Sequence, residues 1–200
     1  MLQPDPPARL AQIQEVEFTE STREFFSQWN NDFFLNVDKN PVLRTFAHHP
    51  ALANAFSPLN IHLLTENTLP VRQRQIAIMR TAWICNCTYM WSSHLRTTQR
   101  CELPTALFDP IKQGADDPYF TPFEAVIIRA TDQLVEYKTI SGENWEVLST
   151  EWNKQQQLDF MFTVGCYVMV AGVMNSAGVE RAENLLELAA EFGAPESRRL

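Results

Sequence analysis

The sequence predicts an all-α fold in which several helices pack into a bundle, and three observations lead to this prediction. Apolar residues make up 45% of the 200 residues, which is enough for the core of one domain. The chain has only six glycines, and runs of β-branched residues are scarce. Segments with helical periodicity follow one another, and no alternating strands, nucleotide-binding glycine motifs or fixed-period repeats occur between them. We therefore expect helices that bury one another's apolar faces.

The first 20 residues are expected to form a flexible N-terminal arm, because they begin with a proline-rich stretch that cannot hold a regular ladder. One helical domain should follow over residues 21–192, and residues 193–200 should form a polar C-terminal tail. Within the domain, the first helix is predicted over 21–30. Residues 41–66 are predicted to form short helices, with a new segment starting at each of Pro50 and Pro58.

Two helices separated by a tight break are predicted near the middle of the chain. The first should span residues 69–85, with Pro70 near its start and apolar residues at helical spacing. Asn86 tolerates the left-handed conformation, so we place the break there. The second helix should run over 88–100. Residues 101–120 are rich in proline and are predicted to be mostly connection.

The last four predicted helices begin with the one that has the clearest start signal. Thr121 and Glu124 form a capping box, and Pro122 occupies the first helical position. A helix that is apolar all round should come third, because residues 160–174 carry no charge. These 15 residues are fewer than the roughly 20 that span a bilayer, so we expect a core or subunit-interface helix. The four predicted ranges are 121–137, 141–152, 155–176 and 181–192.

Composition excludes several classes of function. The formal net charge is −8 and no basic cluster is present, which disfavours binding to nucleic acid. The four cysteines are irregularly spaced and no signal-peptide pattern is visible, so a cytoplasmic protein without a disulfide framework is expected. No cluster of ligands suggests a metal or an organic cofactor, and no membrane association is predicted.

The stretch CNCTYMWSSHLR, residues 85–96, holds the residue types that carry chemistry. Cys87 and His94 are seven residues apart and therefore lie on one helix face, two turns apart. At the start of a helix, the Cys87 thiol would have a lowered pKa. Apolar neighbours such as Met90 and Trp91 could keep His94 titrating near neutrality, where it can act as an acid or a base. The alternative is that both are ordinary packing residues.

The segment LPVRQRQIAIMRTAWICNCTYMWSSHLR resembles the signature of the carboxymuconolactone decarboxylase superfamily, which includes the alkylhydroperoxidase D-like proteins. LRTFAHHPALANAFSPLNIHLL and VGCYVMVAGVMNSAGV resemble the regions before and after that signature, so the resemblance covers roughly residues 40 to 180. The family fold is all-α. Its members form homo-oligomers, commonly dimers, trimers or hexamers, so a homo-oligomer is expected here.

The chain departs from both branches of that superfamily at the same place. The resemblance places Cys87 at the first cysteine of the peroxidase branch and His94 at its histidine, but Met90 at the second cysteine and Gln75 at the glutamate. In the decarboxylase-like branch, Met90 replaces a glutamate. A thioether cannot form the resolving disulfide, and an amide cannot relay a proton as a carboxylate does. Peroxide reduction by a cysteine pair is therefore not expected.

The resemblance implies a carboxymuconolactone decarboxylase-like enzyme that acts by proton transfer on a small hydrophobic substrate. The transfer could serve decarboxylation, isomerisation or lactone chemistry. His94 would be the acid or base, and Tyr89 or Gln75 would donate a hydrogen bond to a developing oxyanion. Two alternatives remain: a single-cysteine peroxidase that uses Cys87, and a non-catalytic relative that serves as a binding or scaffold protein. The predicted catalytic residues are His94, Cys87, Tyr89 and Gln75, and the predicted substrate-binding residues are Trp91, Met90, Trp83 and Tyr167.

Overall fold

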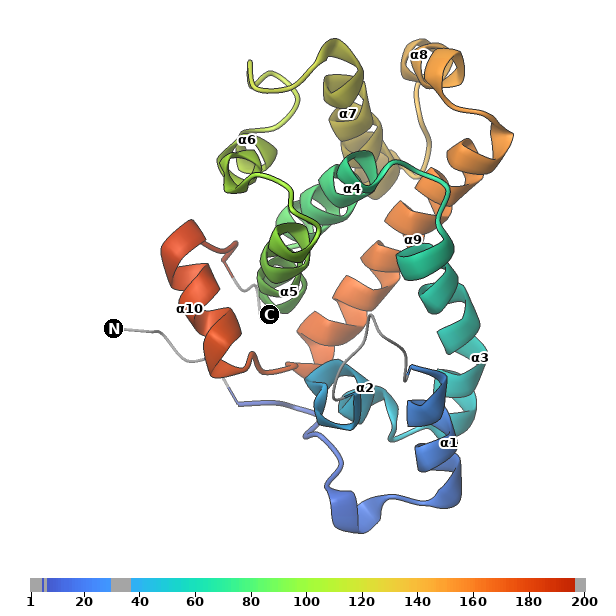
Figure 1. Ribbon diagram of the computed structural model, residues 1–200, viewed down its shortest axis with the longest axis vertical. Coiled ribbons are helices and arrows are strands. Elements are labelled where there is room, and N and C mark those ends of the chain that lie inside the picture. Colours follow the sequence, from blue (N-terminus) through green and yellow to red (C-terminus); the bar gives the residue numbers. More distant parts are fainter. Residues whose placement is uncertain (1–4, 6, 30–36, 197–200) are drawn as a thin grey trace. The chain divides into compact units, whose positions relative to one another are not determined.

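The computed structural model describes residues 5, 7–29 and 37–196, which are entirely helical or irregular in conformation. Figure 1 shows the chain from its blue N-terminal helices to its red C-terminal helix. It divides into two compact units. The N-terminal unit comprises Asp5–Asn67 and Ser176–Glu180, and the C-terminal unit comprises Thr68–Asn175 and the chain from Arg181 onward. The all-α prediction is confirmed for the described residues.

The N-terminal unit is built from short capped helices around an aromatic core. Thr19 caps the first long helix by accepting a hydrogen bond from the Thr22 N–H group, and Asn40 caps the next. Phe25, Phe26 and Trp29 form the core with smaller apolar side chains. The elements are η1 (Glu15–Glu17), α1 (Glu20–Gln28), η2 (Val37–Lys39), α2 (Pro41–Phe46), α3 (Pro50–Ile61) and the π-helical turn η3 (His62–Glu66).

Pro50 begins α3 as predicted, but the prediction that Pro58 starts another segment was wrong. Pro58 lies inside α3, which continues to Ile61. A proline inside a helix removes one backbone hydrogen bond without preventing the flanking residues from keeping helical dihedral angles. The single π turn η3 begins at His62, directly after the end of α3. Such a turn is a place where the regular hydrogen-bond ladder has been shifted.

The described part of the predicted N-terminal arm is attached to its own unit. The N–H groups of Arg9 and Leu10 both donate to the Ala177 carbonyl, at 2.8 and 3.0 Å. Ile13 is buried against the aromatic core. Residues 1–4 and 6 of the predicted arm lie outside the described residues, as do residues 197–200 of the predicted tail.

The C-terminal unit holds every residue of the predicted site. Helix α4 (Val71–Ile84) packs against α5 (Thr88–Arg100), α6 (Phe108–Gln113) and α7 (Pro122–Tyr137). Its remaining helices are α8 (Gly142–Glu151), which packs on α7, α10 (Glu183–Phe192), which packs on α5, and the long α9 (Lys154–Ala177). Figure 1 shows α4 and α5 near the middle of this unit. The predicted helices over 69–85, 88–100, 121–137, 141–152, 155–176 and 181–192 are all present, within about two residues.

The break between α4 and α5 is the predicted one. Asn86 has a φ of 51°, in the left-handed region that asparagine tolerates better than most residues. The next residue, Cys87, is the N-cap of α5, and its N–H group donates to the Ala82 carbonyl at 2.9 Å. This reversal brings the two helices side by side, so that residues of the middle of α4 face residues of α5.

The prediction that residues 101–120 are mostly connection missed one helix. Residues 105–107 form the 3₁₀ turn η4, and α6 follows at once. Arg80 of α4 holds α6 by donating to the carbonyls of Ile111 and Lys112, at 2.8 and 3.1 Å. Its guanidinium also pairs with Asp132 of α7 at 2.6 Å. This short helix is thus stabilised by a partner far away in the sequence, which local pattern cannot reveal.

Helix α7 starts as predicted, with both hydrogen bonds of the Thr121–Glu124 capping box present. Glu124 has a second partner, because Arg72 of α4 approaches its carboxylate to 2.5 Å. This ion pair and the capping bonds lower the pKa of Glu124, although burial opposes them. One side chain therefore both starts α7 and ties it to α4.

Helix α9 is long and apolar enough, by length and composition alone, to cross a membrane, and it is the one described helix with that property. Half of its most apolar window is buried inside the fold. Asp159 near its start accepts hydrogen bonds from the N–H group and the hydroxyl of Thr68, at 2.6 and 2.7 Å. Asn175 near its end donates to the Cys85 carbonyl at 3.0 Å. The helix is therefore an integral part of the C-terminal unit's core.

Candidate functional site

His94 lies in the middle of α5 with its ring buried between α4 and α9. Its Nδ1 is 3.0 Å from Oε1 of Gln75 on α4, and the Thr98 hydroxyl, one turn further along α5, lies 3.3 Å from the same oxygen. With an acceptor oxygen on this side, Nδ1 must carry the hydrogen of a neutral imidazole. The other ring nitrogen, Nε2, then keeps its lone pair. The structure thus brings together the predicted His94 and Gln75, which are 19 residues apart.

Tyr167 of α9 covers another side of the imidazole. The two ring centroids are 5.3 Å apart and the planes make an angle of 70°, an edge-to-face contact. Burial raises the pKa of the Tyr167 hydroxyl far above its usual value, so that the hydroxyl stays protonated. Tyr167 is one of the predicted substrate-binding residues. Within the described part of the chain, its ring is in direct contact with the ring of His94.

The sequence-based prediction that His94 titrates near neutrality was wrong. Burial lowers the pKa of His94 from 6.5 to about 3, and the positive charges of Arg74 and Arg96 lower it further. The ring is only 7% exposed, so water does little to stabilise an imidazolium. His94 is therefore neutral at physiological pH. The apolar helix faces were predicted correctly, but two arginines beside the ring were not anticipated.

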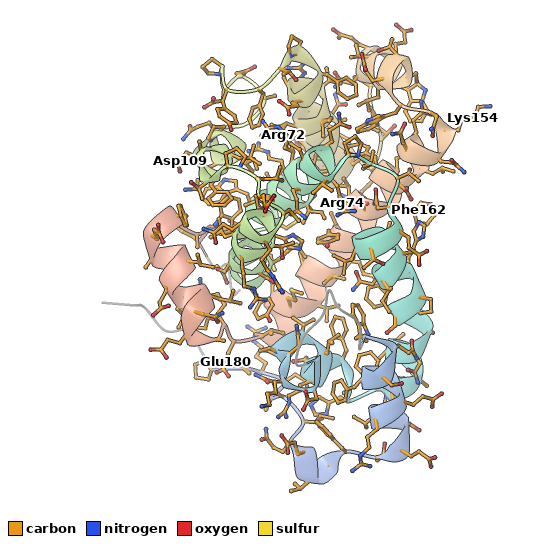
Figure 2. The ribbon with its side chains drawn as sticks, in the orientation of Figure 1. Arg72, Arg74, Asp109, Lys154, Phe162 and Glu180 are labelled. Atoms are coloured by element: carbon orange, nitrogen blue, oxygen red, sulfur yellow. The ribbon has the colours of Figure 1, made fainter. Side chains whose placement is uncertain are left out.

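Those arginines come from the two helices that hold His94 and Gln75. Arg74 on α4 is 8% exposed, and Figure 2 labels it between α4 and α9. Its charge acts on Tyr167 as well as on His94, while that of Arg96 acts on Tyr89 and His94. Sequence reasoning missed both residues because they look like ordinary polar positions of a helix. The signal that could have revealed Arg74 is its place beside Gln75, within the stretch that resembles the family signature.

Cys87 is the N-cap of α5, as predicted, but the expected lowering of its thiol pKa does not occur. The side chain is completely buried, and burial raises the pKa of Cys87 to about 12. The backbone N–H groups of Tyr89 and Met90 oppose this shift without overcoming it. The thiol lies 3.8 Å from the Met174 sulfur of α9. Cys87 therefore behaves as a buried apolar side chain in this structure.

Tyr89 and Met90, in the first turn of α5, are both buried. Burial raises the pKa of Tyr89 to about 12, and the charge of Arg96 partly offsets that effect. Its hydroxyl is consequently a neutral hydrogen-bond donor. Met90 adds apolar surface where the family branches carry a cysteine or a glutamate. Neither residue brings a negative charge to this part of α5.

Trp83 and Trp91 pack against each other, with ring centroids 5.0 Å apart. The indole N–H group of Trp91 donates to the Gly193 carbonyl at 2.7 Å, which ties α5 to the end of α10. The Lys112 ammonium group lies 5.7 and 5.8 Å from the centroids of the two rings. Lys112 thus lies against both tryptophans and Gly193 bonds to Trp91, whereas His94 contacts Gln75 and Tyr167.

The described residues contain no group of three or more histidine, cysteine, aspartate or glutamate side chains that could hold a metal ion. All four cysteines are unpaired, and Cys87 and Cys166 are the buried ones. The candidate site brings a neutral imidazole together with an amide and a tyrosine ring, and the charges of Arg74 and Arg96 act on the imidazole. Such a set can accept a proton and can bind or stabilise a negative charge.

Solved structures with this fold are alkylhydroperoxidase D-like proteins. An uncharacterised peroxidase-related alkylhydroperoxidase D core from Ralstonia eutropha JMP134 aligns at a TM-score of 0.76 with 14% identity, over 96% of this chain and 99% of its own. The debrominase Bmp8, in a complex with 2,3,4-tribromopyrrole, aligns at 0.75 with 12% identity, over 94% and 99%. A protein of unknown function from Agrobacterium tumefaciens, a putative antioxidant-defence AhpD, aligns at 0.60 with 14% identity, over 65% and 90%.

No protein-family model and no curated protein sequence matches the chain. At identities of 12 to 14%, the likeness to the solved structures establishes the fold. The chain therefore has the alkylhydroperoxidase D-like fold, and the resemblance read from the sequence is confirmed at that level. Because the likeness is one of fold, the chemistry of this chain has to be inferred from its own residues.

Proposed function

We propose that the protein is a carboxymuconolactone decarboxylase-like enzyme that acts by proton transfer on a small organic substrate, with His94 as the acid and base. The observation that carries the proposal is the His94–Gln75 pair. A buried neutral imidazole has its Nδ1–H group held by an amide oxygen at 3.0 Å, which leaves a basic nitrogen on the opposite side of the ring.

In the simplest version of the reaction, Nε2 of His94 removes a proton from a carbon next to a carbonyl group. The C–H electron pair moves into the carbonyl as an enolate, and the imidazolium then returns the proton to another carbon, which completes an isomerisation. In the decarboxylation of a β-keto acid, the C–C bond to the carboxylate breaks instead, CO₂ leaves, and the bonding electrons form the enolate. A proton from water, relayed by His94, then adds to the carbon. The neutral hydroxyls of Tyr89 and Tyr167 are suited to donate a hydrogen bond to the enolate oxygen.

The role of Gln75 differs from that of the glutamate found at this position in the family. Its oxygen accepts from Nδ1 of His94 and from the Thr98 hydroxyl. We infer that Gln75 is a positioning residue, which sets the ring's orientation and tautomer without taking a proton itself. An amide leaves the imidazole neutral, whereas a carboxylate would stabilise the imidazolium.

The apolar and aromatic character of the side chains near His94 supports a small, largely apolar organic substrate. The aromatic edge of Tyr167 and the buried Tyr89 and Met90 offer apolar and aromatic surface. Bmp8, which shares the fold, was crystallised with a tribrominated pyrrole, a small aromatic ring. That precedent supports a small ring or ring-like substrate for this chain as well.

The proposal can be tested before the natural substrate is known, by incubating a panel of lactones, β-keto acids and cyclic ketones with the protein in D₂O. Mass spectrometry would follow deuterium incorporation and loss of CO₂. We expect at least one class of compound to react, and His94→Gln to slow the reaction by about a hundredfold or more, the usual contribution of a general base. Cys101→Ser, at the C-terminal end of α5, is the matched control, since it should leave the rate within about threefold.

Two outcomes would replace the proposal by another function. Reduction of an organic hydroperoxide that depends on Cys87 and not on His94 would favour the single-cysteine peroxidase. The burial of Cys87 and its raised thiol pKa speak against that result. Binding of panel compounds without any chemical change, in the wild type and in His94→Gln alike, would favour a non-catalytic binding protein.

A further inference from the structure

We propose that Arg74 and Arg96 form a binding site for a carboxylate group of the substrate, directly beside His94. The proposal rests on the proton-transfer function above and names its substrate class, an organic acid. It begins from an unusual feature of the C-terminal unit: the buried Arg74 and the half-buried Arg96 have no anionic partner among the described residues.

Two other arginines of the same unit each pair with a carboxylate, which Arg74 and Arg96 lack among the described residues. Arg72 meets the Glu124 carboxylate at 2.5 Å, and Arg80 meets Asp132 at 2.6 Å. Among the described residues, Arg74 and Arg96 take part in no ion pair, and the Nε–H group of each is buried without a hydrogen-bond partner. They are the two residues with such an unsatisfied buried side-chain atom in the described part of the chain.

An unpaired buried cation is costly, so its presence calls for an explanation. A buried donor that lacks a partner costs about 1–3 kcal/mol, and more when the group is charged. Removing the partner of a buried charge costs more again, because the remaining charge is no longer solvated by water. Only 8% of Arg74 is exposed to solvent. A ligand that supplies a carboxylate would remove this cost in the bound state.

The two arginines neighbour the His94–Gln75 pair along its two helices. Arg74 lies in α4, one residue before Gln75. Arg96 lies in α5, two residues after His94. Both charges act on the His94 ring, and no anionic side chain contributes to the shift of its pKa among the described residues. The other titratable groups nearby are the neutral hydroxyls of Tyr89 and Tyr167, each of which is affected by one of the arginines.

Arginine suits this task better than lysine would. Its planar guanidinium offers several N–H donors in a fork that matches the two oxygens of a carboxylate. Two such groups that act on one imidazole can hold an organic acid in one orientation. The reacting carbon would then lie near Nε2 of His94, the ring nitrogen that Gln75 leaves unprotonated.

Occupation of the site would also change the base. With the site empty, the two positive charges and burial keep the pKa of His94 at about 3, too low for an efficient general base. A bound carboxylate offsets both charges, which raises the pKa of the imidazole. His94 would thus gain basicity only when an acidic substrate is present. A neutral analogue would bind more weakly, and it would also react more slowly because His94 would remain a weaker base.

The test uses benzoate and inorganic phosphate as anionic probes and benzamide as a neutral probe of nearly the same shape as benzoate. Isothermal titration calorimetry measures their binding to the wild type, Arg74→Gln, Arg96→Gln and the matched control Arg100→Gln. Arg100 is exposed on the same helix, one turn beyond Arg96. NMR of the imidazole resonances follows the titration of His94 with and without each probe.

We expect benzoate to bind at least about tenfold more tightly than benzamide, and Arg74→Gln and Arg96→Gln each to weaken benzoate binding by about tenfold or more. Arg100→Gln should bind benzoate like the wild type. Bound benzoate should raise the pKa of His94 by about one unit or more. Arg74→Gln should leave the melting temperature unchanged or raised, since it removes an unpaired buried charge.

Three results would overturn the proposal. Equal binding of benzoate and benzamide would show that the probe's charge is not recognised. Benzoate binding that survives both Arg74→Gln and Arg96→Gln would place the anion elsewhere. Tighter binding of phosphate than of benzoate would assign the site to phosphate esters instead of carboxylates. The proposed function has its own readout, because deuterium exchange of neutral ketones can succeed where carboxylate binding fails, and the reverse.

Discussion

The amide at position 75 sets the charge of the imidazole beside it. We expect Gln75→Glu to raise the pKa of His94 by at least about two units, because a carboxylate on Nδ1–H stabilises the imidazolium. An NMR titration of the ring measures this change. Gln75→Leu is the control, since it removes the hydrogen bond without adding charge and should leave the pKa low. Unchanged titration in Gln75→Glu would mean that this side chain does not face the ring.

Cys87 should be the least reactive kind of thiol in the folded protein. It is completely buried and its pKa is raised to about 12, whereas Cys85 and Cys101 are partly exposed. We expect iodoacetamide near neutral pH to modify Cys85 and Cys101 first, and Cys87 only after unfolding. Peptide mass spectrometry identifies the modified residues. Early modification of Cys87 in the native protein would refute this account of its burial and revive the peroxidase alternative.

At the scale of the element, α9 presents an apolar stripe that its own unit leaves exposed. Leu158, Phe162 and Met169 are 52%, 56% and 51% exposed, and they are separated by four and seven residues. Gly165 and Gly172 lie on the same stripe, with open space around each. Such heptad spacing is typical of a seam between two helices. Figure 2 shows Phe162 on the side of α9 away from α4.

We therefore expect a homo-oligomer in which a second copy of α9 covers this stripe, since an apolar heptad seam is complementary to itself. Phe162→Glu should convert the assembly into monomers, as measured by sedimentation velocity. Glu151→Lys, an exposed change on α8, is a control that should leave the assembly intact. A monomeric wild type would contradict the expectation, and so would an assembly that Phe162→Glu leaves unaffected.

Helix positions could be predicted where the signals are local. The Thr121–Glu124 capping box, the left-handed Asn86 and the apolar periodicity of α4 each act within a few residues, and the structure has them as predicted. Helix α6 could not be predicted because Arg80, some 30 residues earlier in the chain, completes its hydrogen bonds. Pro58 misled for a similar reason, since a proline's effect depends on how well its neighbours are held.

The whole molecule determines the properties of the site that the sequence left open. His94 and Gln75 could be paired in advance only through the family resemblance, which places both in one signature. The pKa of His94 and the unpaired state of Arg74 depend on burial and on what lies nearby in three dimensions. The same holds for Cys87, whose helix-start position favours a thiolate but whose complete burial prevents it.

Folding stability should respond to acid through His94. Its pKa in the folded protein is about 3, below the reference value of 6.5, so the unfolded chain binds a proton that the folded chain does not. The unfolding free energy therefore falls as the pH drops from about 6.5 towards about 3. We expect His94→Gln to lose less stability than the wild type between these limits, as measured by urea unfolding at several pH values.

His62, whose side chain is 44% exposed, provides a control for that comparison, because His62→Gln removes an imidazole that is not buried. Its stability should fall with acid as steeply as that of the wild type. Equal slopes for His94→Gln and the wild type would show that the His94 ring is not protected from protonation in the folded state.

The ring nitrogens of His94 offer the most direct test of the central claim, that a neutral imidazole with a free basic nitrogen is held ready by Gln75. Two-dimensional ¹⁵N–¹H NMR of histidine-labelled protein near neutral pH distinguishes a protonated ring nitrogen from one with a lone pair. We predict a protonated Nδ1 and an unprotonated Nε2 for His94. A ring protonated on both nitrogens, or on Nε2 alone, would contradict the account.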